Sequence, residues 1–437
     1  MVRHAPSIGL GLGLSLRGYG SSVSFGLLDL YPATAAYSAY DLGNKRGSVT
    51  ESEGTVVNPV QRWRRSSDDA LQMFTAAEVA GGTALTWAKK PGDFTNSGFE
   101  TFTNNGTGDG FTAINSALTG FAMSFTVSGS IGDVVTVDFD VNLVSGSPSL
   151  SLRNGGAVSG STQSNLISIT SSGSYSSTLT ATGAFDKFAF SEGDFPSEFT
   201  VSNVRVSTND AYLLTEYDQS GNDYDLTQTT AAKQPLVVSG GALTVDSLGN
   251  VAPLWDGVND GLKTAANYTD TVTEFGVFIV SENTTNTGQK TMVRIRANGA
   301  AGTVDGATWE QGLSNAASRY GTNTFFEGGG NGVSTVSSGA GTQDTNTHIN
   351  SLLYEQSQIL AYDDGSLETT MTTVQSGSLP IGNVTFSNPI WLGYNFDPSN
   401  RAFGGSIAAV ILYNTDQSAN RAAIEAKLST IVTTAIS

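Results

Sequence analysis

The chain contains no cysteine among its 437 residues, so it can form neither disulfide bonds nor thiolate metal sites. It has only two histidines, His4 and His348, which are too few and too far apart in sequence to suggest a metal centre or a catalytic triad. No segment reaches the ~18 consecutive apolar residues that a membrane-spanning helix needs. We therefore expect no membrane span and no thiol chemistry.

Positive charge is also scarce. The sequence has 21 Lys and Arg against 39 Asp and Glu, and its formal net charge is −18. A surface of this sign repels a phosphate backbone, so we expect no nucleic-acid partner. The sequence has neither a Walker loop nor a Gly-x-Ser-x-Gly elbow, and the Gly-Leu repeat near the start lacks the strand-helix context of a nucleotide site.

The composition that remains is typical of β-sandwiches with many turns. Charged residues make up only 14% of the chain, whereas glycine is abundant at 51 residues and Ser, Thr and Asn are frequent. A length of 437 residues exceeds one ordinary hydrophobic core, so we expect two or three domains. One helix is predicted, over 417–430, and the segment Tyr37–Asp41 is compatible with a helical turn.

Alternation of apolar and polar residues predicts the strands. The clearest example is Val134–Leu143, where every second residue is apolar and faces one side. Further strands are expected at 60–65, 149–153, 199–206, 275–280, 291–296, 349–355, 358–362, 391–394 and 406–413. The sequence Asp363-Asp-Gly365 predicts a hairpin turn, since glycine supplies the positive φ that such turns require.

Two motifs resemble those of a known family. Trp63-Arg-Arg-Ser-Ser-Asp-Asp-Ala70 and, much later, Tyr217-Asp-Gln-Ser-Gly221 resemble the opening of the catalytic β-sandwich of the arabinofuranosidase B family. Many phage virion proteins carry the same pair. In the family the second element follows the first within a few dozen residues, so the long interval here implies an inserted domain.

The end of the chain resembles concanavalin-like (laminin-G-like) jelly rolls. The segment 402–414 is similar to their closing strand, and the helix predicted after it is similar to their C-terminal helix. Trp255-Asp-Gly-Val-Asn-Asp-Gly261 resembles a strand and turn of the same domains. The stretch between the two motifs is similar to carbohydrate-binding modules, with an Asn96-Ser-Gly-Phe-Glu100 opening and a closing strand over 199–206.

These observations predict an all-β protein of two antiparallel jelly-roll β-sandwiches, the second inserted into the first, with an extended N-terminal arm and a short C-terminal helix. The expected parts are an attachment arm at 1–30, the first part of the concanavalin-like sandwich at 31–90, the inserted module at 91–207 and the remainder of the first sandwich at 208–437. In the arm, Leu residues alternate with Gly and Ser, which suits either docking on a partner or a first strand of the sandwich. We expect it to belong to the mature chain, because no convincing cleavage site follows it.

Carbohydrate sites combine exposed aromatic rings with polar side chains nearby. Several aromatic residues lie in or beside polar Gly- and Asn-rich segments and are candidates for sugar stacking, with core or loop packing as the alternative: Trp87, Trp309, Tyr320, Phe325, Phe326, Tyr394 and Phe396. Glu310 follows Trp309 directly and is a candidate carboxylate for such a site, with Asp256 or Asp260 able to face it. Spacing alone does not select these residues over Glu216, Glu327 or Asp397. Trp63 and Trp255, inside strand patterns, are expected in the core.

One polar loop has oxygen ligands spaced for a hard cation. Asp218, Asn222, Asp223 and Asp225 lie in a single turn, so calcium is one interpretation and an Asx-turn that satisfies backbone N–H groups is the other. Glu100 is a second calcium candidate, through its resemblance to binding modules that hold an ion near that position. Arg65 is expected to pair with Asp68 or Asp218 as a structural contact.

Together, the residues and the resemblance predict a phage virion surface protein that adheres to host or environmental glycans. The absence of cysteine fits a protein assembled in a reducing host cytoplasm, and the expected partners are other virion proteins, bound through residues 1–30, and a host-surface polysaccharide. A homotrimer is expected by analogy with spikes and fibres. Two alternatives stay open: a capsid decoration or tail component with no glycan ligand, and a glycosidase of the arabinofuranosidase type.

Overall fold

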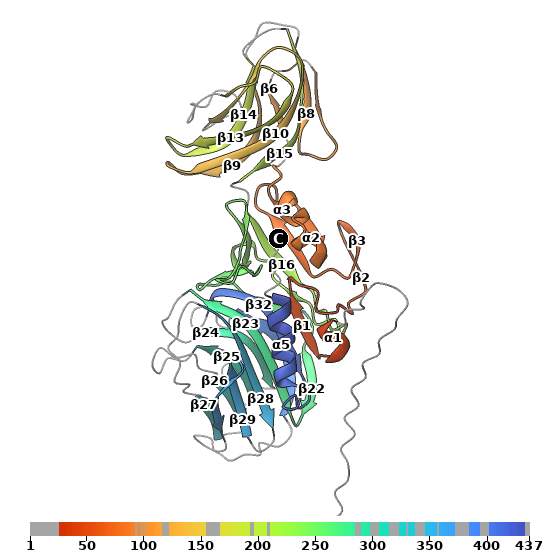
Figure 1. Ribbon diagram of the computed structural model, residues 1–437, viewed down its shortest axis with the longest axis vertical. Coiled ribbons are helices and arrows are strands. Elements are labelled where there is room, and N and C mark those ends of the chain that lie inside the picture. Colours follow the sequence, from red (N-terminus) through yellow and green to blue (C-terminus); the bar gives the residue numbers. More distant parts are fainter. Residues whose placement is uncertain are drawn as a thin grey trace, which may run out of the picture.

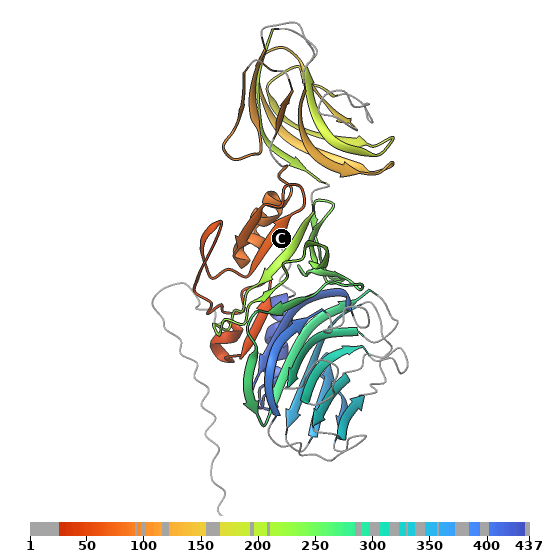
Figure 2. The same cartoon turned by 180° about the vertical axis from the view of Figure 1, so that it is seen from behind.

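The computed structural model places two β-sandwiches one beyond the other along the long axis of the molecule, joined by a narrower middle part (Figures 1 and 2). The structure describes residues 26–91, 94–97, 99, 101–115, 122–153, 167–192, 196–207, 210–284, 290–297, 306–313, 323–328, 331–336, 346–355, 358–371, 384–393 and 402–432. No helix in these ranges is long and apolar enough to cross a membrane.

The larger sandwich has two antiparallel sheets. One sheet consists, in spatial order, of β30 (Ser366–Met371), β29 (Gln358–Asp363), β28 (Thr347–Glu355), β23 (Phe275–Asn283), β32 (Gly404–Tyr413) and β1 (Ala35–Ser38). The other consists of β22 (Tyr268–Val272) and β21 (Leu262–Thr264), both paired with β31 (Val384–Leu392), followed by β24 (Lys290–Ala297), β25 (Gly306–Leu313), β26 (Asn323–Gly328) and β27 (Asn331–Val336). Alternate residues of β23, such as Val277 and Ile279, fill the core between them with Val293 and Ile390.

The predicted C-terminal helix is confirmed as α5 (Arg421–Val432), which lies on the outer face of the first sheet (Figure 1). Ile424 and Leu428 bury against Phe278 and Ile411 there. The last residues of the expected arm differ from the prediction, because Leu27–Leu30 form helix α1 and Leu27 is buried in the same cluster. Residues 1–25 lie outside the described residues.

Two more helices were not predicted from the sequence. Helix α2 (Ala76–Ala80) begins at Thr75, whose side chain accepts the Glu78 N–H while the Glu78 carboxylate accepts the Thr75 N–H. Helix α3 (Thr83–Ala88) follows directly. The prediction of a helical turn at Tyr37–Asp41 was wrong for its first residues: β1 extends to Ser38 and pairs with β32, with all four of its residues buried.

The smaller sandwich pairs only within itself in the described residues. Its sheets are β7 (Thr101–Asn104), β8 (Phe111–Asn115), β15 (Ser197–Val206), β10 (Val134–Ser145), β13 (Gly173–Thr180), and, opposite, β6 (Thr95–Ser97), β9 (Ala122–Gly129), β14 (Phe185–Glu192), β11 (Pro148–Arg153) and β12 (Ile167–Ser168). The predicted inward face of β10 is confirmed, with Val135, Val137, Phe139 and Val141 buried. These strands begin and end within the range 91–207 that the sequence predicts for the insertion, and the all-β class with one sandwich inserted into the other is confirmed.

The middle part is an antiparallel ladder that continues into the larger sandwich. Its order is β5 (Leu71–Phe74), β4 (Gln61–Arg65), β16 (Ala211–Glu216), β18 (Leu236–Ser239) and β20 (Leu254–Asp256), and β20 pairs with β32. Short strands β17 (Leu226–Thr227) and β19 (Ala242–Leu243), the hairpin of β2 (Ser48–Glu51) and β3 (Gly54–Val57), and the 3-10 turn η1 (Ala231–Lys233) lie around it. This ladder carries the candidate site.

Candidate functional site

The register of the ladder places four residues in one row across four strands. Arg64 of β4 lies opposite Tyr212 of β16, Tyr212 opposite Leu236 of β18, and Leu236 opposite Leu254 of β20. Residues directly opposite one another in a sheet share a face, so the row presents one continuous surface. Two apolar side chains, one aromatic ring and one guanidinium thus meet on the same side of the sheet.

This row forms the floor of an open pocket of about 730 Å³. The size lies within the range of small-molecule sites, roughly 300–1,000 Å³. The rest of the lining comes from the residues after β4 and β23, from η1 and the residue that follows it, and from β20 and its turn. These residues are Ser66, Ala231, Ala232, Gln234, Trp255, Asp256, Asp260 and Thr284. The pocket therefore combines an apolar floor with hydrogen-bond donors and acceptors at its rim.

Arg64 is held in a fixed position beside the pocket. Its guanidinium lies over the Tyr212 ring, 4.9 Å from the ring centroid, and its Nε donates to Gln234 Oε1 at 2.7 Å. Its Nη1 pairs with Asp69 Oδ1 at 2.8 Å. Buried Gln234 also donates its Nε2 to the Gln228 carbonyl oxygen, so it anchors the arginine to the body of the protein. The Asp69 carboxylate partly neutralises the charge of the guanidinium.

The turn after β20 carries two carboxylates that line the pocket. Asp256 Oδ1 accepts the N–H groups of Val258, Asn259 and Asp260, while Asp260 Oδ2 accepts the Asp256 N–H at 2.9 Å. Asp256 is exposed and Asp260 is buried. Burial, together with the nearby Asp256 charge, raises the pKa of Asp260 to about 6. The Asp256 carboxylate is therefore exposed to solvent, whereas the neighbouring Asp260 carboxylate is buried.

The core predictions for this region are confirmed. Trp63 and Trp255 are 0% and 1% exposed, and both belong to the core of the larger sandwich. Arg65 pairs with Asp68 through two contacts of 2.8 and 2.6 Å, as the sequence predicts. The guanidinium of Arg65 also lies 4.8 Å from the centre of the Trp87 ring.

Trp87, a predicted sugar-stacking residue, lies on α3 and is half-buried. Its ring meets the Phe74 ring edge-on at 5.4 Å, in addition to the Arg65 contact. Trp309 and Glu310 lie on β25, and Phe325 and Phe326 lie on β26, where Ala307 pairs with Phe326; the structure describes the backbone of these strands. Tyr320, Tyr394, Phe396 and Glu100 lie outside the described residues. Whether any of these nine residues contacts sugar or calcium stays a prediction.

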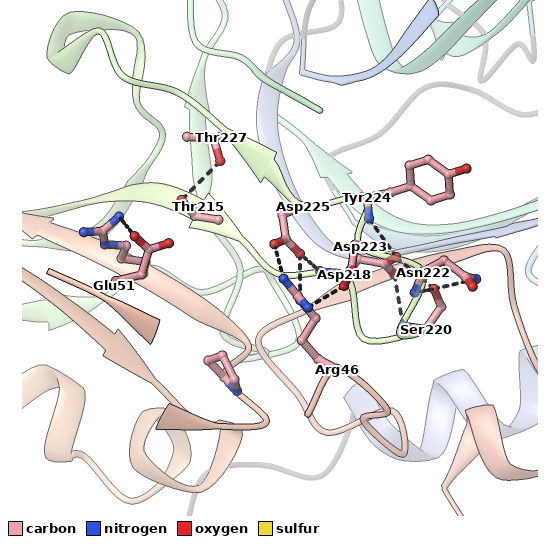
Figure 3. Close-up of polar contacts among 12 residues, drawn as sticks. Arg46, Glu51, Thr215, Asp218, Ser220, Asn222, Asp223, Tyr224, Asp225 and Thr227 are labelled. Atoms are coloured by element: carbon pink, nitrogen blue, oxygen red, sulfur yellow. Dashed lines mark hydrogen bonds and ion pairs between the residues drawn. The ribbon is translucent and has the colours of Figure 1, made fainter. Parts of the chain in front are cut away.

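The four residues predicted to bind calcium do lie in one turn, but an arginine joins two of them. Arg46 donates its Nε and Nη2 to the Asp225 carboxylate at 3.1 and 2.7 Å and pairs with Asp223 through Nη1 (Figure 3). Asn222 points elsewhere, with its Nδ2 donating to the Thr34 carbonyl oxygen at 2.9 Å. The carboxylates of Asp223 and Asp225 thus face a guanidinium, and the positive charge of Arg46 offsets part of their negative charge.

Asp218 forms the Asx-turn that was the alternative interpretation. Its buried carboxylate accepts the N–H groups of Ala36, Ser220 and Tyr224 and the Ser220 hydroxyl, at 2.8–3.2 Å. Burial raises the pKa of Asp218 above its usual value, although these hydrogen bonds act in the opposite direction. The carboxylate therefore ties β1 to the turn after β16.

Within the part of the chain whose side chains are described, one trio of His, Asp or Glu residues has ligand atoms within 4.8 Å of one another: His348, Asp363 and Asp364. His348 Nδ1 lies 3.1 Å from Asp363 Oδ1 and 2.9 Å from Asp364 Oδ2. This trio lies at the predicted hairpin, which is confirmed by positive φ values at Asp364 and Gly365.

The comparisons with known proteins gave structural matches alone. No protein-family model matches the chain, and the comparison with curated proteins gave no match. A carbohydrate-binding module (CBM40) of the Ruminococcus gnavus IT-sialidase, bound to α2,3-sialyllactose, is 15% identical over 38% of this chain and 95% of its own, with a TM-score of 0.28.

Two enzymes are also similar. A GH54 α-L-arabinofuranosidase soaked with a cyclic sulfate inhibitor is 15% identical, covering 70% of this chain and 63% of its own, with a TM-score of 0.33. The Trypanosoma rangeli sialidase is 14% identical, covering 50% and 31%, with a TM-score of 0.30. At these identities and TM-scores the likeness transfers neither a site nor an activity to this chain.

Proposed function

We propose that the protein binds a glycan in the pocket over the β4-β16-β18-β20 ladder. The observation that carries this proposal is the row of Arg64, Tyr212, Leu236 and Leu254, surrounded by polar side chains. A sugar ring has an apolar face and a rim of hydroxyls, so it needs apolar and aromatic contact below and paired donors and acceptors at the sides. The pocket supplies both kinds of group.

The donors and acceptors are held in place before any ligand arrives. Arg64 is fixed by Gln234 and Tyr212, and Asp256 is fixed by three backbone N–H groups. Groups that are already ordered lose little conformational freedom on binding, so more of the contact energy appears as affinity. Weak affinity at one site would rise if many copies acted together.

A glycan array probed with the purified protein tests the proposal. Ala232, which is exposed and lines the pocket, is replaced by Trp to fill the space without disturbing the core. The matched control is Leu248→Trp, at an exposed residue that does not line the pocket. We expect wild type and the control to bind the same glycans and Ala232→Trp to lose them. Unchanged binding by Ala232→Trp would remove the pocket as the site.

Hydrolysis is a second candidate, favoured by the pair Asp256 and Asp260. Glycosidases use two carboxyl groups, one of which is kept protonated by its surroundings, and burial raises the pKa of Asp260 to about 6. Release of reducing ends from arabinosides and capsule polysaccharides measures this activity. Glycosidase activity at this pair requires that Asp260→Asn abolish release; activity that survives the substitution would place the chemistry elsewhere.

We also propose that the protein acts on the surface of a phage particle, as an adhesin. The support is the resemblance of the Trp63–Ala70 and Tyr217–Gly221 motifs to those of virion proteins, and the lack of cysteine in a chain of this size. Mass spectrometry of purified particles of a phage that encodes this sequence would detect its peptides in stoichiometric amount. Their absence from the particles would refute this location. Presence with no glycan bound on the array would favour a decoration or tail role instead.

A further inference from the structure

The charges around the pocket are predominantly negative at neutral pH. Asp256 and Asp260 both line it, and Arg64 is the single cation among the lining residues that the structure describes. Asp69, which pairs with Arg64 at 2.8 Å, adds a third carboxylate immediately outside. Lys233, on the adjoining η1, is not among the lining residues. A ligand that enters therefore meets more negative than positive charge.

Arg64 is also poorly placed to serve an incoming anion. One nitrogen already donates to Gln234, another already faces Asp69, and one side of the guanidinium is covered by the Tyr212 ring. Recognition of a carboxylate by arginine is strongest when two parallel N–H groups are free to form a fork. A forked contact between an acidic sugar and this guanidinium would compete with Gln234 and Asp69 for these nitrogens.

We propose that this pocket selects glycans without carboxylate or sulfate groups, and that Asp256 and Asp260 are the residues that exclude acidic ones. This inference rests on the proposed function and adds the chemical class of the ligand. Exposed Asp256 can accept hydrogen bonds from sugar hydroxyls, whereas an ionised sugar would be repelled by it. The discrimination is electrostatic, so it weakens when salt shortens the screening length below ~10 Å.

The geometry also gives the selection a dependence on pH. Asp260 faces Asp256 through the turn hydrogen bond, with Arg64 and Tyr212 across the pocket. Burial raises the pKa of Asp260 to about 6, so this group is charged at pH 7.5 and neutral at pH 5. Sugar carboxylates, with pKa values of ~3–4, stay ionised over that interval. Exclusion of acidic glycans should therefore relax as the pH falls from 7.5 to 5.

The experiment compares matched pairs of glycans. The neutral glycan that binds best on the array is tested by calorimetry against the same backbone carrying a carboxylate, such as lactose against sialyllactose or methyl-esterified against free oligogalacturonate. We expect the acidic member to bind at least roughly fivefold more weakly at pH 7.5 and low salt, since one unit-charge repulsion at short range in water is of that order. The difference should shrink at pH 5 and in high salt.

Two substitutions identify the cause. Asp256→Asn and Asp260→Asn each remove the charge but keep an oxygen that can accept the N–H groups of the turn. Together they should bring the ratio of the affinities for the two members of each pair close to one, whatever they do to the affinity for the neutral member. Asp260→Asn alone should abolish the change between pH 7.5 and pH 5. Asp186→Asn, on the smaller sandwich and 53% exposed, removes the same charge far from the pocket and should leave discrimination intact.

Each result is decisive. Equal or tighter binding of the acidic member by wild type overturns the selection while leaving glycan binding standing. Discrimination that survives the double substitution overturns the role of the two aspartates. The proposed function fails if Ala232→Trp abolishes the binding of neither member of the pair, and the inference then fails with it.

Discussion

Glu216 offers a sharp test of the packing of the larger sandwich. This residue ends β16 and is 4% exposed. Its Oε2 accepts the Nε2 of Gln61 at 2.9 Å, while Oε1 has no hydrogen-bond partner among the described residues. Burial raises the pKa of Glu216 from its ordinary 4.5 to about 8. The carboxyl group is therefore neutral in the folded protein at pH 7 and ionised in the unfolded chain.

The sign of the effect follows from proton linkage. Between pH 4.5 and 8 the folded state holds a proton on Glu216 that the unfolded state has lost, so the free energy of unfolding falls as the pH rises through this window. At ~1.4 kcal/mol for each pH unit, Glu216 alone accounts for a loss of about 3–5 kcal/mol by pH 8. In Glu216→Gln, which cannot ionise but keeps an oxygen for Gln61, this loss should be absent.

Urea unfolding followed by tryptophan fluorescence measures this loss of stability between pH 5 and pH 8. All five tryptophans lie outside 91–207, so the signal reports the larger sandwich and its ladder and not the inserted one. Any constant cost of placing an amide in the core cancels when each protein is compared with itself at pH 5 and pH 8. Glu274→Gln, at a half-buried position of the same sandwich, is the control. The reasoning is refuted if wild type and Glu216→Gln lose the same stability between the two pH values.

Three further substitutions test other contacts. Gly393→Ala should destabilise the larger sandwich by about 2 kcal/mol or more in urea, because Gly393 has φ +82° and an added Cβ would lie 2.0 Å from the buried Trp255 ring; unchanged stability would contradict that contact. Arg65→Met should cost about 3 kcal/mol, since it leaves Asp68 half-buried without its partner. Because pairing with Arg65 lowers the pKa of Asp68 below its ordinary 3.8, the loss should shrink as the pH falls below 3.8 and that carboxylate becomes protonated. Phe111→Ala, in the core of the smaller sandwich, should lower the stability of that sandwich by about 3–5 kcal/mol by calorimetry. A matching loss in the tryptophan-detected transition would show instead that the two sandwiches unfold together.

Much of the fold could be predicted from the sequence because it depends on patterns among residues that are close together in the chain. The alternation in Val134–Leu143 identifies the buried face of β10, and Asp363-Asp-Gly365 identifies the turn between β29 and β30. Arg65 and Asp68 are three residues apart, so their pairing needs no knowledge of distant strands. Helices α2 and α3 are too short for a helical period of apolar residues to be detected in the sequence. The packing of Val79 and Ala84 in the core stabilises these two helices.

The pocket could not be predicted, because its floor depends on the register of strands far apart in the chain. Arg64, Tyr212, Leu236 and Leu254 become neighbours only when β4, β16, β18 and β20 align. A shift of one residue in any of them would turn its side chain to the other face. Two local signals point to the site: Arg64 lies in the motif around Trp63 that resembles a known family, and Asp256 and Asp260, which the sequence offers as carboxylates for a sugar site, both line the pocket.

The turn that contains Asp218, Asp223 and Asp225 shows a second limit of spacing arguments. Asp223 and Asp225 have suitable spacing for a hard cation, yet Arg46, far away in sequence, lies against both. The identity of the partner of a carboxylate cluster is a tertiary property. In this turn a guanidinium provides the positive charge, and backbone N–H groups satisfy Asp218.

The most direct measurement is a crystal structure of the protein with the glycan that binds best on the array. We predict density for a sugar ring over Tyr212 and Leu236, with hydroxyls within hydrogen-bond distance of Asp256 and Gln234. Sugar density over β25–β27 or on the smaller sandwich, with the ladder pocket unoccupied at a saturating glycan concentration, would contradict the proposed site.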